Sequence, residues 1–329
     1  MTDEHGTFSS NENDYLELLK KVNEDNKMLK SELEEQKRIL NSQNEILNII
    51  MSNKFIKANG LLRKLQLHTL ELVKFIDNVC SKYDLKFWLE FGTLLGAVRH
   101  EGFIPWDDEV DLAMLRSDYE KFMEVLPIEI ERFEGLKKQL NVRKGSYVFK
   151  NAEYTEKSKT PVLQFIHKKP HAGVEVYPLD YLDIPENDTD RLNQIATELV
   201  NERNKFRHEY KNGICSFEDG IVNGNAKVGI VYTETDILVN SLDGANRKPI
   251  PISDVFPLKK CRFEGCEFNM PRNPLEYLST YYSGNVMKIP KEIRHHHFTD
   301  QIQKIGSNEE LDKLYDETIQ FWRNINNNF

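Results

Sequence analysis

The densest chemistry in this chain lies in an acidic run at residues 107–111, which read Asp-Asp-Glu-Val-Asp. Alternate side chains of a strand share one face, so Glu109 and Asp111 would point the same way while Val110 and Leu112 face the core. Two carboxylates placed together repel each other, and one of them tends to stay protonated. A hard divalent cation removes that conflict, and Mg²⁺ favours a few carboxylates together with substrate phosphates. We therefore predict a site for Mg²⁺ or Mn²⁺ at Glu109 and Asp111.

The alternative interpretation of this run is a solvated acidic loop, because most runs of charged residues are of that kind. Residues 109–114, however, read Glu-Val-Asp-Leu-Ala-Met, in which polar and apolar side chains first alternate and then give way to an apolar end. This pattern is typical of a half-buried strand. We therefore interpret residues 109–114 as a strand.

A phosphate-binding element is predicted just before the acidic run. A short aromatic segment, typical of a buried strand, is interrupted by Gly92 and Thr93. Residues 94–99 then read as a short helix, whose N-terminus would offer unpaired N–H groups and a partial positive charge that suit phosphate. We assign Gly92 and Thr93, together with Asp107 and Asp108, as cofactor-binding candidates.

Two basic residues stand at the end of this predicted helix. Arg99 and His100 are the basic residues nearest to the predicted phosphate-binding turn, and both are catalytic candidates because a cation can neutralise phosphate charge. The alternative, that either side chain only packs the helix end, stays open on the sequence alone.

A further carboxylate lies in a short apolar segment at residues 174–176, which read Val-Glu-Val. A lone charge in such a strand needs a partner, because burial of an unpaired charge is costly. Glu175 therefore needs a partner from elsewhere in the chain, and one interpretation is a structural residue that forms a salt bridge with a Lys or Arg.

The segment FGTLLGAVRHEGFIPWDDEVDLAM at residues 91–114 closely resembles the core motif of the LicD family. That family includes bacterial phosphocholine transferases and is similar in its core to the fukutin-related proteins. The resemblance extends, in scattered motifs, over residues 87–115, 173–180 and 253–297. It implies the nucleotidyltransferase fold, in which a Gly-Ser/Thr turn precedes a strand with two alternating carboxylates and a later strand supplies a third.

The resemblance also implies roles for single residues. Glu109, Asp111 and Glu175 would be the metal ligands, although Glu109 and Glu175 stand where the family usually has Asp. A Glu is one methylene longer and is still a hard oxygen ligand. Asp111 or Glu175 would take the proton from the acceptor hydroxyl. The donor would be a CDP-activated alcohol such as CDP-choline, and the acceptor a glycan, as in the modification of lipopolysaccharide or teichoic acid.

Two other functions remain open at this point. One is a nucleotidyltransferase-fold enzyme that moves a nucleotidyl group onto a protein or small molecule. The other is a catalytically silent scaffold, which the two Asp-to-Glu changes and a predicted coiled coil would both suit. Release of CMP, incorporation of labelled nucleotide, and binding without turnover would distinguish the three.

The elements that must position these residues divide the chain into three parts: a disordered tail at 1–14, a coiled coil at 15–57 and a LicD-like domain at 58–329. The domain is predicted to be α+β, with a nucleotidyltransferase-like mixed sheet and flanking helices. The coiled coil rests on a heptad register, and an Asn at a core position favours a parallel dimer. Its two core positions hold Leu19, Asn26, Leu33, Leu40 and Leu47, and Val22, Leu29, Gln36, Gln43 and Ile50. We expect a homodimer, and the alternative is a lone amphipathic helix on its own domain.

Composition excludes several other classes of protein. The net charge of −9 argues against a nucleic-acid surface, whose footprint is basic. No apolar run reaches the ~18 residues needed to span a bilayer, and the acidic, polar N-terminus does not resemble a secretory signal. Four cysteines in 329 residues do not form a disulfide framework or a metal-ligand pattern. These observations predict a soluble, cytoplasmic protein without a transmembrane segment.

Overall fold

The computed structural model describes all of the chain except eleven stretches. These are residues 1–5, 52–55, 145–162, 183–189, 191–193, 195–196, 199–200, 202–229, 232–236, 240–248 and 290–306. The chain divides into two compact units, Met1–Met51 and Ser52–Phe329.

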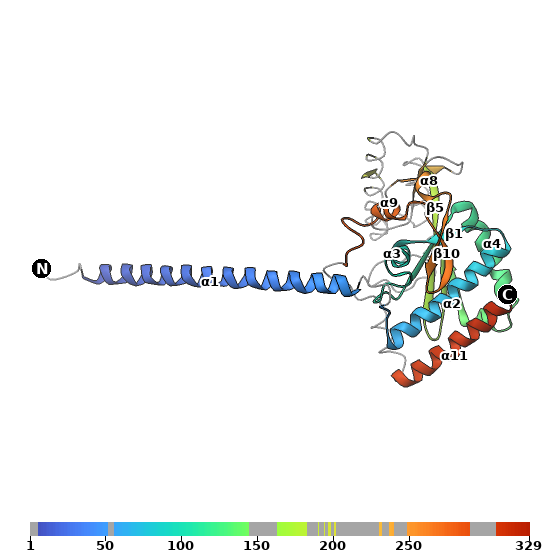
Figure 1. The fold of residues 1–329 in the computed structure, drawn as a ribbon, viewed down its shortest axis with the longest axis horizontal. Coiled ribbons are helices and arrows are strands. Elements are labelled where there is room, and N and C mark those ends of the chain that lie inside the picture. Colours follow the sequence, from blue (N-terminus) through green and yellow to red (C-terminus); the bar gives the residue numbers. More distant parts are fainter. Residues whose placement is uncertain are drawn as a thin grey trace, which may run out of the picture. The chain divides into compact units, whose positions relative to one another are not determined.

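The first unit consists of one long helix, α1 (Gly6–Met51) (Figure 1). It begins at Gly6 and thus earlier than the predicted start at Tyr15. The apolar residues at both predicted heptad positions are exposed; Leu33, for example, has 54% of its surface accessible. A helix with such a stripe is typical of a coiled-coil strand. Pairing of this helix with another remains a prediction.

The second unit is built on a mixed sheet with the strand order β1-β2-β5-β4-β3. The bounds are β1 (Phe87–Leu89), β2 (Val110–Leu115), β5 (Ala172–Leu182), β4 (Leu163–His167) and β3 (Leu140–Lys144). β2 and β5 run parallel, and the other pairs in this order are antiparallel. The far end of β5 also pairs with β6 (Ile230–Val231) and β7 (Ile237–Val239), and β7 pairs with β8 (Ile250–Pro251).

Two long helices, α2 (Gly60–Lys82) and α11 (Asn308–Asn327), lie side by side over one face of this sheet (Figure 1). Their shared core is aromatic. The ring of Phe75 stacks on Phe165 of β4, with centroids 5.8 Å apart, and meets Trp322 edge-on at 5.5 Å. Ser307 caps α11 by accepting a hydrogen bond from the backbone of Glu310, whose side chain accepts from Ser307 in return. This face therefore provides the hydrophobic core of the unit.

The remaining elements complete the predicted α+β fold, which is confirmed. They are α3 (Phe91–His100), α4 (Arg116–Glu131), α5 (Leu136–Gln139), α8 (Ile252–Val255), α9 (Pro274–Ser279) and a hairpin of β9 (Lys259–Phe263) and β10 (Cys266–Met270). Glu264 and Gly265 form the hairpin turn with φ values of 52° and 79°, as a two-residue turn between twisted strands requires. Among the helices that the structure describes, none combines the length and apolar character that a bilayer crossing needs.

Candidate active site

The two carboxylates predicted on separate strands lie next to each other. Asp111 of β2 and Glu175 of β5 are direct partners in the parallel pairing. Residues in register on neighbouring strands project from the same face of the sheet. On the other side of β5, Gln164 of β4 is the partner of Glu175. At the other end of the row, the backbone N–H of Glu90 donates to the carbonyl of Asp111 over 2.9 Å. Polar residues thus line up across four neighbouring segments of the chain.

Neutral donors hold the side chain of Glu175. The Gln164 amide donates to one carboxylate oxygen at 2.7 Å, and the Tyr177 hydroxyl donates to the other at 2.6 Å. In the described part of the chain no Lys or Arg forms an ion pair with Glu175, Asp111 or Glu109. The alternative of a structural salt bridge at Glu175 therefore finds no partner among those residues.

Two acidic residues of the site, Glu109 and Asp111, have raised pKa values. Burial, followed by the charges of Glu175, Asp108 and Asp107, raises the pKa of Glu109 from 4.5 to about 8. Burial and the charges of Glu109 and Glu175 raise the pKa of Asp111 well above its ordinary range. Val110 and Leu112, which alternate with these carboxylates along the chain, are buried, as the alternation predicted. The chain therefore gathers like charges in a partly buried place, which costs stability unless a cation or a proton joins them.

The donor chemistry of this cluster fits a hard divalent cation, because all candidate ligands are carboxylate oxygens. No three His, Cys, Asp or Glu side chains of the described residues are grouped closely enough to hold a metal ion as they stand. The assignment of Glu109, Asp111 and Glu175 as metal ligands therefore stays a prediction. A bound cation would need to draw these side chains together.

Gly92 and Thr93 lie in the first turn of α3 and not in a separate turn before it. The sequence analysis placed the start of the helix at Leu94, but the N–H of Leu94 already donates to the carbonyl of Glu90 at 3.0 Å. The N–H groups of Phe91, Gly92 and Thr93 consequently have no acceptor within the helix. The predicted phosphate donors thus lie at a helix N-terminus, which is favourable for an anion.

Contacts connect this helix end with the acidic run. The Thr93 hydroxyl oxygen accepts the backbone N–H of Asp111 at 2.9 Å. A Cβ at Gly92 would lie 3.0 Å from a carboxylate oxygen of Asp107, so only glycine leaves that approach unobstructed. The backbone N–H of Asp108 donates to the other oxygen of Asp107 at 3.1 Å. The four residues assigned to cofactor binding therefore lie together beside the metal candidates.

Arg99 and His100 are buried, and their contacts fix the end of α3. The Arg99 Nε donates to the His100 Nε2 at 2.9 Å, and one terminal nitrogen donates to the carbonyls of Val286 and Lys288 at 3.2 and 3.3 Å. Burial, and then the charge of Arg99, lowers the pKa of His100 to about 4. His100 is therefore neutral near pH 7. These contacts agree with the packing alternative, and a catalytic role for either residue remains a prediction.

Glu90 is a residue of the site that the sequence analysis did not select. It is fully buried and precedes α3, and one oxygen accepts from the Trp88 indole at 3.1 Å and from the Tyr277 hydroxyl at 2.6 Å. Its charge contributes to the raised pKa of Asp111. The position of a carboxylate between the apolar strand and Gly92 could have identified Glu90 from the sequence. The next residue, Phe91, has a φ of 42°, a backbone conformation that bulky residues rarely adopt and that is often found at functional sites.

Comparisons with known proteins show which sequences this chain resembles. Residues 84–202 match the family described as LicD/FKTN/FKRP, nucleotidyltransferase domain. Over 64 residues the chain is 44% identical to lipopolysaccharide cholinephosphotransferase LicD of Haemophilus influenzae, which covers 20% of this chain and 24% of that protein. It is 36% identical over 85 residues to the uncharacterized protein RT0683 of Rickettsia typhi, covering 26% and 28%. It is 42% identical over 48 residues to human ribitol 5-phosphate transferase FKRP, covering 15% and 10%. The matched segments thus span less than a third of each of these relatives, and they confirm the resemblance predicted from the sequence.

Proposed function

We propose that this chain, whose residues 84–202 match the LicD nucleotidyltransferase family, is a metal-dependent transferase that moves a phospho-alcohol from a CDP-activated donor to a glycan hydroxyl. The observation that carries the proposal is the pairing of Asp111 with Glu175 beside the N-terminus of α3. It places candidate metal ligands next to candidate phosphate donors. We propose phosphocholine as the transferred group, because the relative from Haemophilus is named a cholinephosphotransferase.

In the proposed reaction the acceptor hydroxyl oxygen attacks the phosphorus that carries the alcohol. The bond from that phosphorus to the oxygen of CMP breaks, and CMP leaves with the bonding electrons. Asp111 or Glu175 takes the proton from the hydroxyl. The N–H groups of Gly92 and Thr93 bind a donor phosphate. A divalent cation held by Glu109, Asp111 and Glu175 would supply neutralisation of the phosphate charge.

The choice of the transferred group has a second candidate. The human relative is named a ribitol 5-phosphate transferase, so CDP-ribitol belongs in the donor panel beside CDP-choline. A different nucleotidyltransferase activity would appear instead as incorporation of labelled nucleotide into an acceptor. A silent scaffold would bind nucleotide with Mg²⁺ and release no CMP.

The experiment that tests the proposal is CMP release from these donors with Mg²⁺ or Mn²⁺, comparing the parent chain with Asp111→Asn. We expect release by the parent that depends on the cation and is lost in the variant. The variant is matched in size, so folding is checked by its circular dichroism. Release that persists unchanged in Asp111→Asn would contradict the proposed site. The absence of release with every donor, together with nucleotide binding, would favour the scaffold.

We propose further that the protein is a homodimer through α1. The exposed heptad stripe supports this, with Asn26 at a core position favouring two parallel strands. Sedimentation of the full chain tests it. We expect the mass of a dimer, and a monomer for Leu33→Glu, which places a charge in the seam. A parent chain that sediments as a monomer would reject the homodimer.

A further inference from the structure

The segment that joins α3 to β2, residues 101–109, carries the acidic residues Asp107, Asp108 and Glu109 into the site. It contains a turn in which the N–H of Asp107 donates to the carbonyl of Ile104 at 2.9 Å. Because these carboxylates repel one another, contacts from other parts of the chain help to hold the segment in place.

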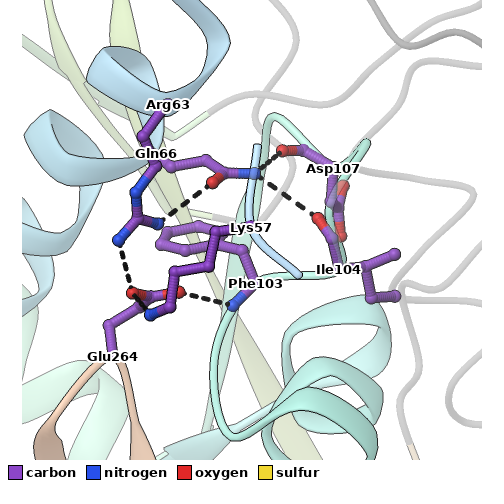
Figure 2. Close-up of polar contacts among 7 residues, drawn as sticks. All are labelled: Lys57, Arg63, Gln66, Phe103, Ile104, Asp107 and Glu264. Atoms are coloured by element: carbon purple, nitrogen blue, oxygen red, sulfur yellow. Dashed lines mark hydrogen bonds and ion pairs between the residues drawn. The ribbon is translucent and has the colours of Figure 1, made fainter. Parts of the chain in front are cut away.

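A single buried side chain holds this turn from the helix α2. The Gln66 amide nitrogen donates to the carbonyl of Asp107 at 2.9 Å and approaches the carbonyl of Ile104 at 3.4 Å (Figure 2). Only 1% of the surface of Gln66 is accessible. A hydrogen bond in such a dry place is costly to leave unmade, so Gln66 fixes both ends of the turn relative to α2.

Arg63 fixes the orientation of this amide. Its guanidinium donates to the Gln66 amide oxygen at 3.2 Å (Figure 2). Because a guanidinium has donors only, the oxygen of Gln66 must face Arg63 and the NH₂ group must face the two carbonyls. The other terminal nitrogen of Arg63 donates to Glu264 at 2.6 Å. Arg63 therefore connects the turn with the tip of the β9–β10 hairpin.

Glu264 holds the beginning of the same segment. One oxygen accepts the backbone N–H of Phe103 at 3.2 Å, and the other accepts from Arg63 and from Lys57 (Figure 2). The backbone N–H of Glu264 also donates to the carbonyl of Glu101 at 2.9 Å. The Glu264 side chain is 3% accessible. Two distant parts of the chain thus hold the segment at both ends.

We propose that Gln66, oriented by Arg63 and Glu264, is a positioning residue that sets the place of Asp107, Asp108 and Glu109 opposite Asp111 and Glu175. The inference rests on the proposed function for its consequence, which is the affinity of the site for a divalent cation and the phosphates bound with it. Gln66 touches only main-chain carbonyls of the segment, so it acts through the carboxylates and is not itself a catalytic residue.

The test uses Gln66→Met, which keeps the volume and removes both hydrogen bonds. Mn²⁺ alone is the probe, with its affinity measured by electron paramagnetic resonance. Loss of a residue that orients metal ligands typically lowers affinity about 10- to 100-fold, and we expect a loss in that range. Hydrogen exchange of the amides of residues 101–109 should become faster in the same variant.

The matched control is Lys64→Met on the same helix. Lys64 forms ion pairs with Asp312 and Asp316 of α11 and contacts no residue of the segment. We expect parental Mn²⁺ affinity and parental exchange at residues 101–109. Arg63→Lys keeps the positive charge but cannot donate to Gln66 and Glu264 from two separate guanidinium nitrogens. Its Mn²⁺ affinity should lie between those of the parent and Gln66→Met.

The outcomes separate this inference from the proposed function. Mn²⁺ binding by the parent with unchanged affinity and exchange in Gln66→Met would overturn the inference and leave the proposed function intact. A parent chain that binds no Mn²⁺ would overturn the metal-dependent function and the role of Gln66 in it. Equal losses in Lys64→Met and Gln66→Met would show that general destabilisation of α2 explains the effect, and would also overturn the inference.

Discussion

Two carboxylates of the protein, Glu129 and Glu109, have pKa values shifted in opposite directions. Glu129 of α4 is buried and accepts from Lys82 at 2.8 Å, from the Tyr83 hydroxyl at 2.6 Å, and from Arg132. Burial would raise its pKa, but these hydrogen bonds outweigh burial and lower the pKa to about 2. Glu109 is surrounded by other carboxylates, and its pKa rises to about 8.

The difference lies in whether the fold provides a cationic side chain beside the carboxylate. At Glu129 the chain supplies the cations itself, so the carboxylate stabilises the native state. At Glu109 and Asp111 the described residues supply no such partner, and burial of these groups opposes folding. Carboxylates with pKa values shifted in this way cluster at functional sites.

Removing a carboxylate of the site should affect turnover far more than stability. We expect Glu175→Gln to reduce phospho-alcohol transfer by about 10²- to 10⁴-fold, the range for loss of a general base. The amide keeps a polar contact with Gln164 or Tyr177, so the melting temperature should stay within a few degrees. CMP release and a thermal melt measure both. Parental turnover in Glu175→Gln would remove this residue from the site.

A divalent cation should stabilise the protein through the acidic cluster. With Mg²⁺ at 100 times its dissociation constant, the free energy of unfolding should rise by about 2.7 kcal/mol. Calorimetry with and without Mg²⁺ measures this, and removal of the ion by a chelator should reverse it. Asp111→Asn should respond little. An equal response in both chains would place the ion elsewhere.

Removing the carboxylate of Glu129 should affect stability and leave turnover unchanged. Glu129→Gln should lower the free energy of unfolding by about 2 kcal/mol, because it loses hydrogen bonds to charged groups. Turnover should stay at the parental level, since Glu129 has no contact with the site. Urea denaturation and CMP release measure the two quantities. A large loss of turnover in a folded variant would show that the two regions are coupled.

The pH dependence of stability should carry the signature of Glu109. Its pKa is raised from 4.5 to about 8, so the folded chain keeps a proton that the unfolded chain releases above about 4.5. The free energy of unfolding, measured without metal, should therefore fall as the pH rises from about 4.5 to about 8. Glu109→Gln should make this fall smaller, because the variant has no carboxyl group at residue 109 to titrate. An unchanged profile in the variant would contradict the raised pKa.

Local patterns predicted the core side of the acidic strand. Strand alternation identified Val110 and Leu112 as core residues, because a period of two is a local property, but β2 begins at Val110 and leaves Glu109 just before the strand. The start of α3 was missed because Gly92 and Thr93 resemble a turn. In the structure β1 ends at Leu89, and the N–H of Leu94 donates to the carbonyl of Glu90, so the helix begins at Phe91.

Long-range contacts could not be predicted from the residues alone. The pairing of Asp111 with Glu175 came from the family resemblance, since the register between two distant strands leaves no periodic signal. The hydrogen bonds from Gln66 to the segment 101–109 could not be predicted from the sequence either. A single amide within the apolar face of a helix has an evident partner only when the β9–β10 hairpin and the segment 101–109 are both in place.

The parallel pairing of β2 with β5 has a consequence for the growing chain. Parallel neighbours need a long connection, and here β3 and β4 are made between the two strands. During synthesis β2 leaves the ribosome long before β5, so its carboxylates meet their counterpart only late. Repulsion between Asp111 and Glu175 therefore arises only after α2, α3 and α4 have been made. By then the packing of these helices can offset the repulsion.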